Sequence, residues 1–316
     1  MENRPRISII VPYYNTPVRF LAPLLKSILS QDYEDFELLV VNDGSTDKEG
    51  LDLLSSIPDQ RLKVINKENG GVSSARNLGL TMFSGDLLYF ADSDDELRPG
   101  LFSFIAKNFE EDETLDLLVF STDLRLENGK VVTHQHHECI TFTGEEGFAA
   151  VCTAGSFMYN NLWGKVYNVS RLGRDKLVPF NTSITRGEDK FWHLMMMREV
   201  KKGKTSGFIG YIHNVNPGSI THHSHTEVGR MQAFELMLDY IDQVEGKSGN
   251  YYEMMASYYN KTQWSLMLRV FSRKDSDKKA FKETLSRLHK ELKGKRIKSS
   301  EYAWRKLLTP LLLIIT

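Results

Sequence analysis

Cysteine is scarce in this chain, and long apolar runs are missing. Two cysteines in 316 residues, Cys139 and Cys152, argue against a disulfide framework or a four-thiolate metal site. No stretch approaches the roughly 20 apolar residues that a membrane-spanning helix needs. The start also lacks the apolar core of a secretory signal, because the mostly apolar stretch Ile7–Val11 stops at Pro12. We therefore expect a cytoplasmic protein.

Two common nucleotide-binding motifs are also missing. No G-x-G-x-x-G follows the first apolar run, and no G-x-x-x-x-G-K-[ST] occurs, which disfavours a dinucleotide fold and a P-loop. We find no internal repeat and no low-complexity linker. What is present suffices for a folded core, since 41% of the residues are hydrophobic and 26% are charged. The length of 316 residues indicates about two domains.

Charge is unevenly distributed along the chain. From Lys261 to the end there are 15 Lys and Arg against 5 Asp and Glu, a net charge of +10, whereas the whole chain carries −1. A basic tail on an acidic body is typical of proteins that bind an anionic membrane or nucleic acid, although a solvated helical face gives the same pattern.

The first hundred residues alternate between strand and helix patterns. Buried strands are indicated by short, largely apolar runs at Ile7–Tyr14, Phe36–Val41, Leu62–Asn66 and Leu87–Ala91. Helices are indicated by apolar spacing over Phe20–Gln31 and Val72–Phe83. Strands and helices in this order predict a parallel sheet with helical crossovers. Further on, we expect a helix at Pro99–Phe109 and a hairpin of Leu115–Leu126 with Lys130–His136.

Polar clusters follow these strands, where a parallel sheet binds its ligands. They are Tyr13–Asn15, Asn42–Gly44, Asn69–Gly71 and Asp92–Asp95. In the last of them three carboxylates lie within four residues, and such groups repel one another unless a cation lies among them. Mg²⁺ and Mn²⁺ take oxygen ligands and bridge carboxylates to substrate phosphates. A solvated turn before the next helix would carry the same residues.

At this point the sequence resembles a known family. The segments are ISIIVPYYN (7–15), SILSQDYEDFELLVVNDGSTD (27–47), ENGGVSSARNLGL (68–80) and GDLLYFADSDDEL (85–97). Their order, spacing and residue types are similar to those of family 2 glycosyltransferases with the GT-A fold. The resemblance covers residues 7–97 almost continuously. It implies an α/β fold with a Rossmann-like, mostly parallel sheet flanked by helices, followed by a C-terminal helical domain.

The resemblance also implies roles for residues of this half. Asp43 would accept a hydrogen bond from the base, which we expect to be uracil, although Asn42 stands where the family often has a second acidic residue. Arg76 would lie near the base or the diphosphate, Asp92 would reach the ribose, and Asp94 would bind Mn²⁺ or Mg²⁺. The full set of implied donor-binding residues is Pro12, Tyr14, Asn15, Asp43, Gly71, Arg76, Asp92 and Ser93.

Two acidic residues in the second half are candidates for acid–base chemistry. Glu188 and Asp189 open an apolar helical stretch, where an ionised carboxylate is favoured and also serves as a plain helix cap. In the family such a pair faces the acceptor, and one member is the base. Inverting transfer needs a base that deprotonates the acceptor hydroxyl during attack on the anomeric carbon. We favour Asp189 and keep Glu188 as the second candidate.

Three further residues complete the expected site. Trp163 is a candidate to stack on the acceptor sugar, although an aromatic residue at that spacing is as often part of a core. Asp95 would support Asp94 and lie on the acceptor side. His222 would complete the metal shell from a loop that closes over the diphosphate in the family, unless its loop simply carries unliganded histidines. A zinc site at His134, His136 and His137 is disfavoured, because His137 points away from the other two in an extended segment.

The expected organisation is therefore a GT-A domain over residues 1–225 and a basic helical domain over 226–316. Residues 1–97 would form the nucleotide-sugar-binding half of the first domain, and 98–225 the acceptor-side half. Residues 290–316 run from a basic stretch into an apolar one, which suits attachment to an anionic membrane surface or a protein partner. We expect a peripheral protein on the inner face of the membrane, with a homo-oligomer left open and no nucleic-acid partner.

The sequence thus predicts a metal-dependent, inverting glycosyltransferase for hexosyl or N-acetylhexosaminyl groups. It would use a nucleotide-sugar, in our expectation a UDP-sugar, and a hydroxyl of a growing or lipid-linked glycan in cell-surface polysaccharide or glycoconjugate synthesis. Two other readings stay open. A nucleotidyltransferase would need a basic phosphate-binding loop after the first strand, which PYYNTP lacks. A non-catalytic module would bind nucleotide through the sheet and a partner through the basic helices, without turnover.

Overall fold

The structure is a computed structural model of the whole chain. It describes residues 4–153, 161–216, 225–246 and 249–258. The expected metal ligand His222 and the expected membrane-binding stretch 290–316 lie outside these residues.

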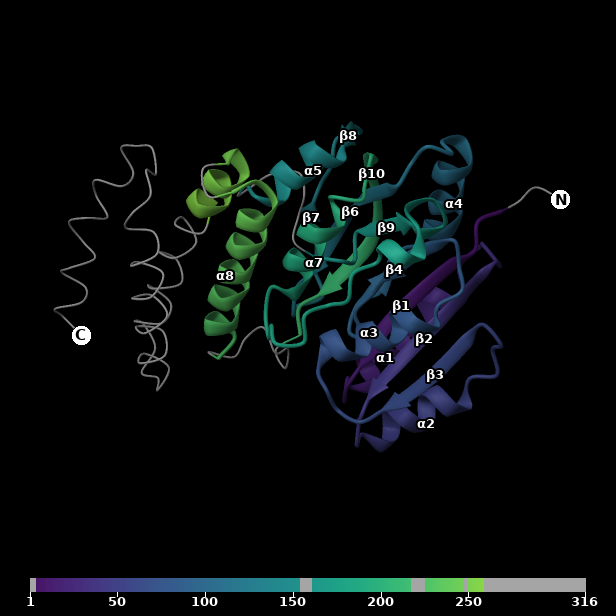
Figure 1. Cartoon of the computed structure of the whole chain (residues 1–316). Coiled ribbons are helices and arrows are strands. Elements are labelled where there is room, and N and C mark those ends of the chain that lie inside the picture. Colours follow the sequence, from purple (N-terminus) through teal and green to yellow (C-terminus); the bar gives the residue numbers. More distant parts are fainter. Residues whose placement is uncertain (1–3, 154–160, 217–224, 247–248, 259–316) are drawn as a thin grey trace.

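One mixed sheet runs through the described part of the molecule (Figure 1). Its strand order is β3-β2-β1-β4-β9-β6-β10-β5, with β7 paired to β6 and β8 paired to β10. Strands β1 to β4 are parallel to one another, and β6 is parallel to β10. Because β9 is antiparallel to both β4 and β6, the strands β4 and β6 point the same way. The carboxyl ends of β1, β2, β4, β6 and β10 therefore meet at one edge of the sheet.

The bounds of the elements are as follows. The strands are β1 (Ile7–Tyr13), β2 (Phe36–Asp43), β3 (Leu62–Lys67), β4 (Leu87–Phe90), β5 (Glu96–Leu97), β6 (Leu117–Arg125), β7 (Val131–Gln135), β8 (Thr141–Thr143), β9 (Lys165–Asn168) and β10 (Lys202–Asn214). The helices are α1 (Val18–Leu29), α2 (Lys48–Ser56), α3 (Val72–Met82), α4 (Leu101–Glu111), α5 (Gly144–Val151), α6 (Val169–Leu172), the 3₁₀ turn η1 (Arg174–Lys176), α7 (Glu188–Met196) and α8 (His225–Glu245). A further helix covers 250–258.

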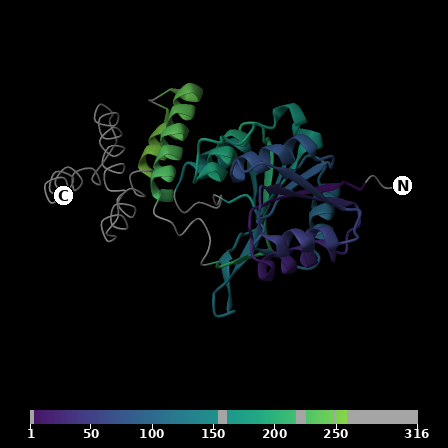
Figure 2. The same cartoon turned by 90° about the horizontal axis from the view of Figure 1, so that it is seen from below.

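Helices cover both faces of the sheet (Figure 2). Alternate residues of a strand point to opposite faces, and the buried side chains sort accordingly. Ile9 and Leu38 belong to one apolar cluster together with residues of α1, α2 and α4. Ile10 and Leu39 belong to a second cluster together with residues of α3, α5, α7 and α8. Both faces of β1 and β2 are thus buried, which explains their nearly continuous apolar sequences.

The predicted fold class is confirmed, and so are the elements predicted in the first hundred residues. Each of the four predicted strands and both predicted helices is present within a few residues of its expected ends. Pro12 lies in an interior strand although proline has no backbone N–H. It is tolerated because the pairing of β1 with β4 ends at Ile10 with Phe90, so no N–H of residue 12 is needed to bond β4. The hairpin of β6 and β7 and the helix α4 are also as predicted.

Strand β10 was not predicted from the sequence. Its segment KGKTSGFIGYIHN mixes lysines and glycines with apolar residues and shows no regular alternation. Register shifts interrupt its pairing with β6 between Ser206 and Tyr211. Gly210 is required by close packing, because a Cβ there would lie 2.5 Å from Leu101 and 2.9 Å from Phe120. The strand is therefore specified by its neighbours more than by its own pattern.

The described part of the expected C-terminal domain is helical and shares the core of the sheet domain. Phe234, Met237 and Ile241 of α8 are buried in the same cluster as Trp192 of α7. Met255, from the helix 250–258, belongs to that cluster as well. The packing is therefore continuous across the expected boundary at residues 225 and 226. Residues 259–316 lie outside the described part.

Candidate active site at the carboxyl edge of the sheet

The polar clusters that follow the parallel strands are joined by direct hydrogen bonds. Asn15, after β1, accepts through Oδ1 from the backbone N–H groups of Thr46 (2.8 Å) and Asp47 (3.0 Å) after β2. Thr16 and Ser93 share a hydrogen bond of 2.5 Å between their hydroxyl oxygens, which connects the ends of β1 and β4. The polar clusters after β1, β2 and β4 therefore lie together at one edge of the sheet, as the order of strands and helices predicted.

Asn15 adopts a backbone conformation that few residues accept. Its φ is +49°, in the left-handed region where Asn is better tolerated than most residues other than Gly. This bend follows β1 and leaves the neighbouring Tyr14 side chain exposed, with 51% of its surface accessible. An exposed aromatic ring beside the polar edge is available to a planar ligand such as a nucleobase.

Asp43 is buried at the end of β2 and organises the start of α3. Its Oδ1 accepts from the Gly70 backbone N–H (3.0 Å) and from Lys67 Nζ (2.5 Å), and its Oδ2 accepts from the Gly71 N–H (2.8 Å). Gly71 has a φ of +85°, so glycine is favoured there. Both carboxylate oxygens thus have partners. A hydrogen bond from a base would have to use a remaining lone pair of the carboxylate.

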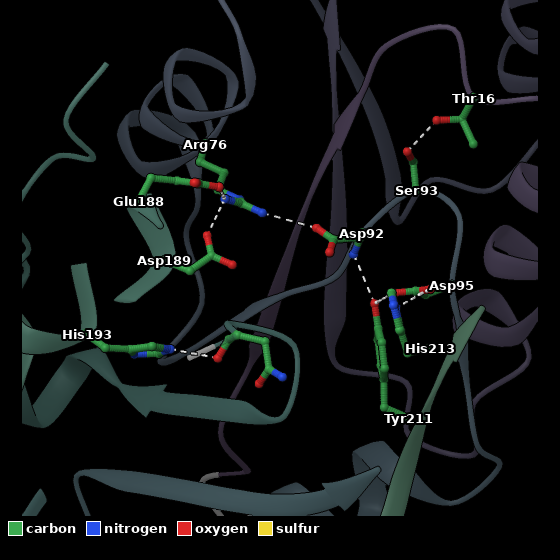
Figure 3. A network of polar contacts seen from close by, with 11 residues as sticks. Thr16, Arg76, Asp92, Ser93, Asp95, Glu188, Asp189, His193, Tyr211 and His213 are labelled. Carbon is green, nitrogen blue, oxygen red and sulfur yellow. Dashed lines mark hydrogen bonds and ion pairs between the residues drawn. The ribbon is translucent and has the colours of Figure 1, made fainter. Parts of the chain in front are cut away.

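The turn Asp92–Asp95, which follows β4 and is called the acidic turn below, is held by the end of β10 (Figure 3). Asp95 has no exposed surface, and its oxygens accept from Tyr211 Oη (2.8 Å), His213 Nδ1 (3.1 Å) and the Asn214 backbone N–H (2.8 Å). Asp95 therefore holds the turn against the end of β10. A direct contact with an acceptor would require it to leave these partners.

His213 and Asp95 form an ion pair. Burial alone would lower the pKa of His213, but the hydrogen bond and charge of Asp95 raise it to about 9. Burial raises the pKa of Asp95 to about 6, against the opposing effect of His213. At neutral pH both groups are therefore charged. The ring of His213 is oriented by this pair and by stacking on Trp163 at 5.3 Å.

Asp94 lies beside this pair and is partly buried. Its Oδ2 accepts from Asn216 Nδ2 (3.0 Å), and its backbone carbonyl accepts from Asn214 Nδ2 (2.8 Å). Asn214 is oriented in turn by Arg125, whose Nη1 donates to Asn214 Oδ1 (3.0 Å). Burial and the neighbouring Asp92 raise the pKa of Asp94. An added positive charge would favour its ionised form.

Within the described part of the chain, the acidic turn offers ligands for a divalent cation but no complete set of protein ligands. Among residues 4–153, 161–216, 225–246 and 249–258, no three His, Cys, Asp or Glu side chains converge as a metal-binding group. Asp94 supplies a carboxylate, and hard cations prefer oxygen ligands of this kind. Burial disfavours the ionised form of Asp94, so a bound cation would offset that effect. Mg²⁺ commonly takes one or two carboxylates and completes its shell with water and substrate phosphates. The residues present fit that mode of binding.

Arg76 connects the acidic turn to the start of α7 (Figure 3). Its Nη1 donates to Asp189 Oδ1 (2.7 Å) and Glu188 Oε1 (3.1 Å), and its Nη2 donates to Asp92 Oδ1 (3.1 Å). The sequence placed these residues in separate halves, with Arg76 and Asp92 toward the donor and the acidic pair toward the acceptor. The structure brings all four into contact.

The pKa of the Asp189 carboxylate is strongly perturbed by its surroundings. Burial raises its pKa well above the ordinary range, Arg76 opposes the shift, and Glu188 and Asp92 add to it. Glu188 and Asp189 lie in the first turn of α7, which begins after Gly187 at a φ of +90°. The positive end of the helix dipole is therefore directed at them.

Trp163 is largely enclosed, with 7% of its surface exposed. It stacks on Tyr211 with a ring-centroid distance of 5.1 Å and an interplanar angle of 5°. Its two neighbours in the stack, Tyr211 and His213, are the same residues that hold Asp95. In this structure Trp163 supports the acidic turn and offers little surface to a sugar.

Sequence reasoning missed Tyr211, His213, Asn214 and Asn216. They end or follow a strand whose carboxyl end lies at the ligand edge, so the rule used for the first four strands would have found them. That rule could not be applied because β10 itself was not predicted. The expected ligand His222 lies outside the described residues.

These features define a class of protein. It is an α/β protein with a mostly parallel, Rossmann-like sheet and an acidic turn at the carboxyl edge of that sheet, where such sheets bind their ligands. The comparison with known families is specific. Residues 8–165 match the family described as glycosyl transferase family 2. The chain belongs to this family, as the sequence resemblance predicted.

Individual relatives agree with this assignment. The chain is 31% identical over 231 residues to the uncharacterized glycosyltransferase EpsJ of Bacillus subtilis (strain 168), covering 69% of this chain and 63% of EpsJ. It is 28% identical over 253 residues to an uncharacterized glycosyltransferase of Haemophilus influenzae, covering 77% of each. The matched region thus spans less than two thirds of the length of EpsJ.

Solved structures share the fold. Residues 1–349 of S. aureus TarS in complex with UDP-GlcNAc match with a TM-score of 0.65 at 21% identity. The match covers 81% of this chain and 72% of that one. The GT-A architecture is therefore confirmed. Separately, no helix in the described part of the chain is both long and apolar enough to cross a membrane.

Proposed function

We propose that this chain is a metal-dependent, inverting glycosyltransferase that moves a sugar from a UDP-sugar to a hydroxyl of a glycan. One observation carries the proposal. The acidic turn Asp92–Asp95 and the acidic pair of α7 face each other across Arg76, at the edge where a parallel sheet binds its ligand. A donor bound at the turn would thus have a carboxylate base opposite its departing diphosphate.

The donor would bind against the ends of β1, β2 and β4. The residues we assign to it are Pro12, Tyr14, Asn15, Asp43, Gly71, Asp92 and Ser93, with Arg76 treated below. The exposed ring of Tyr14 supports a contact with the base. UDP-GlcNAc is the first donor to test, because TarS has been solved in complex with it.

Asp94 would hold Mn²⁺ or Mg²⁺ together with the phosphates of the donor, and His222 is the candidate for a further ligand. When bound, such a cation neutralises charge on the departing diphosphate. The chain's own contribution is to fix the carboxylate. Asn216 and Asn214 hold the side chain and the backbone of Asp94, and β10 holds Asp95 behind it.

Asp189 would act as the base. It takes the proton of the acceptor hydroxyl while that oxygen bonds to the anomeric carbon from the face opposite the diphosphate, and the bond from that carbon to the phosphate oxygen breaks. Burial raises the pKa of Asp189, which makes its ionised carboxylate a stronger proton acceptor than that of an exposed aspartate. Glu188 is the second candidate, and its contact with the same guanidinium keeps it within reach.

We further propose a lipid-linked or growing glycan as the acceptor, used on the inner face of the membrane in cell-surface polysaccharide or glycoconjugate synthesis. The support is the sequence of residues 290–316, where basic residues lead into an apolar run. A protein held at the membrane by this stretch would have its site close to a lipid-borne acceptor. Trp163 stays a candidate for contacting the sugar only through its small exposed edge.

The test is turnover of a panel of UDP-sugars, led by UDP-GlcNAc, with the full-length chain and Mn²⁺. We expect release of UDP from one sugar, loss of the release in EDTA, and an anomeric configuration in the product opposite to that of the donor. UDP binding without turnover of any sugar would favour a non-catalytic nucleotide-binding module. Release of pyrophosphate from a nucleoside triphosphate would favour a nucleotidyltransferase.

A further inference from the structure

Arg76 is buried, and most of its hydrogen-bonding capacity is already used by protein carboxylates. The residue is 3% exposed. Of the five N–H donors of a guanidinium, three point at Asp189, Glu188 and Asp92. The Nε–H is buried and has no hydrogen-bond partner among the described residues. The guanidinium is thus held mainly by protein carboxylates, and a diphosphate would have to compete with them for this buried group.

The backbone on both sides of Arg76 is fixed. Helix α3 packs closely on β1, because a Cβ on Gly79 would lie 2.6 Å from Ile10. Asn77, next to Arg76, makes a reciprocal pair of hydrogen bonds with the backbone of Phe180, at 2.9 and 2.7 Å. Phe180 also lies 5.5 Å from the guanidinium carbon of Arg76 and stacks on Trp192 of α7 at 5.0 Å. These contacts hold α3 and α7 in register, so the contact between Arg76 and Asp189 is built into the packing.

The charges around Asp189 make Arg76 its principal positive neighbour. From α3 it faces Arg76, from α7 Glu188, from the end of β4 Asp92, and from β9 Lys165 and Tyr167. Burial lowers the pKa of Lys165 to about 7, with Asp189 opposing the shift, so this lysine carries only part of a positive charge near neutral pH. Without Arg76, three carboxylates would lie together with little to balance them.

We propose that Arg76 is a positioning residue for the base: it orients the Asp189 carboxylate toward the acceptor hydroxyl and balances its negative charge, and it does not bind the donor diphosphate. This inference rests on the proposed role of Asp189. It departs from the family resemblance, which places Arg76 near the base or the diphosphate of the donor. It also gives the two halves of the domain a direct link, from Asp92 at the donor side to Asp189 at the acceptor side.

The test compares Arg76→Gln and Arg76→Lys in the full chain, with Arg171→Gln as the matched control. Arg171 also pairs with a buried carboxylate, Asp116, but lies on α6, away from the ligand edge. Two quantities are measured, namely the Kd for UDP with Mn²⁺ and the pH profile of turnover with the UDP-sugar that the wild-type enzyme accepts.

For Arg76→Gln we expect a Kd for UDP within about threefold of wild type, turnover lower by roughly 10²-fold, and an acid limb of the pH profile displaced to higher pH. The direction follows because loss of the guanidinium raises the pKa of Asp189 further. Arg76→Lys keeps the positive charge but lacks the planar guanidinium. Compared with Arg76→Gln, it should bring the acid limb back close to its wild-type position while turnover stays below that of the wild type. Arg171→Gln should match the wild type in both quantities.

A tenfold or greater loss of UDP affinity, with the acid limb unmoved at saturating donor, would overturn the proposal and return Arg76 to the donor site. If Arg76→Gln does not fold, the double variant Arg76→Gln/Glu188→Gln removes one of the unbalanced carboxylates and allows the same two measurements. Failure of the proposed function itself is a different result, because the wild-type protein would then bind UDP and turn over no sugar.

Discussion

At the scale of single residues, Asp94 is the carboxylate on which the expected metal dependence rests. Asp94→Asn keeps the size of the side chain and removes the charge. We expect loss of the Mn²⁺-dependent part of UDP binding and of turnover, with thermal unfolding close to wild type because the side chain is only partly buried. Titration calorimetry with UDP, with and without Mn²⁺, measures the effect. Equal UDP affinity of the variant and the wild type in Mn²⁺ would contradict it.

Glu37 is a residue whose effect should appear in stability and not in catalysis. Its buried carboxylate accepts from Ser8 Oγ (2.6 Å), Ser84 Oγ (2.8 Å) and Lys63 Nζ (2.8 Å). Burial alone would raise its pKa, but these hydrogen bonds lower it from 4.5 to about 2. A folded-state pKa below the unfolded one stabilises the protein above pH 4.5 and loses that effect as the pH falls toward 2.

We therefore expect Glu37→Gln to lower the free energy of unfolding at pH 7 by roughly 2 to 3 kcal/mol, the order set by this shift and by the lost hydrogen bonds. The difference between variant and wild type should narrow as the pH falls to 3. Urea unfolding at both pH values measures it. If the free energies of unfolding of the variant and the wild type differ as much at pH 3 as at pH 7, the ionised carboxylate of Glu37 is not the source of the stabilisation.

Residue types alone predicted which side chains lie at the ligand edge but not which ones touch. Arg76 and Asp189 are 113 positions apart, and their contact depends on how α3 and α7 pack. Asp95 reads from the sequence as one more acidic residue of the turn. Its burial and its pairing with His213 arise only because β10 lies beside β5. Such pairings need the tertiary structure.

At the scale of elements, β10 is the strand that shapes the acidic turn. Tyr211 Oη donates to Asp95 (2.8 Å) and accepts from the Asp92 backbone N–H (3.1 Å). Tyr211→Phe removes both hydrogen bonds and leaves the stacking on Trp163. We expect a loss of about 1 to 2 kcal/mol in the free energy of unfolding. We also expect about tenfold lower turnover or metal affinity, the usual scale for groups that hold a metal ligand in place.

Tyr33→Phe is the matched control for this strand. Tyr33 is also buried and donates one hydrogen bond, to the Pro5 carbonyl (2.8 Å), but it lies among the residues that precede β2, at the other edge of the sheet. It should lose stability and keep turnover. If both variants lose turnover equally, the effect of Tyr211→Phe reflects general destabilisation and not the acidic turn.

The elements that the sequence predicted are those that carry their own signal. Strands β1, β2 and β4 are short apolar runs, and α1 has a regular apolar face. Helix α5 was missed although its N-terminus has a complete capping box between Thr143 and Glu146. It is only eight residues long, and its glycines weaken the helical pattern.

At the scale of the whole molecule, the described helices after residue 225 share one apolar cluster with the sheet domain. The helical pattern of the sequence suggested a separate domain after residue 225, and the excess of basic residues begins at Lys261. The described helices of that region instead bury Phe234 and Met237 against α7. Apolar spacing along a helix tells that one face is buried, but not against which partner.

The basic tail leads us to predict that the protein binds to an anionic membrane surface. Residues 290–316 lie outside the described part, and their amino-acid sequence is the support for this prediction. Near an anionic surface each basic residue contributes about 1 kcal/mol, and the apolar end adds a contribution that salt does not screen. We expect the full chain to bind anionic vesicles and the chain without Trp304–Thr316 to bind them much less, with activity on a soluble acceptor retained.

Cosedimentation with vesicles at low and high salt measures this effect, and neutral vesicles serve as the control. The competing interpretation is that the tail packs into the helical region or a dimer interface. An insoluble truncated chain, together with an intact chain that ignores anionic vesicles at low salt, would support that interpretation and contradict ours.

We propose that α7 supplies the base while the acidic turn binds the donor, and one variant separates the two roles. At saturating UDP-sugar we expect Asp189→Asn to lower turnover by roughly 10²-fold or more while the Kd for UDP with Mn²⁺ stays near wild type. If the variant loses UDP binding and keeps its rate at saturation, Asp189 belongs to the donor site, and the division of roles proposed for this edge of the sheet is wrong.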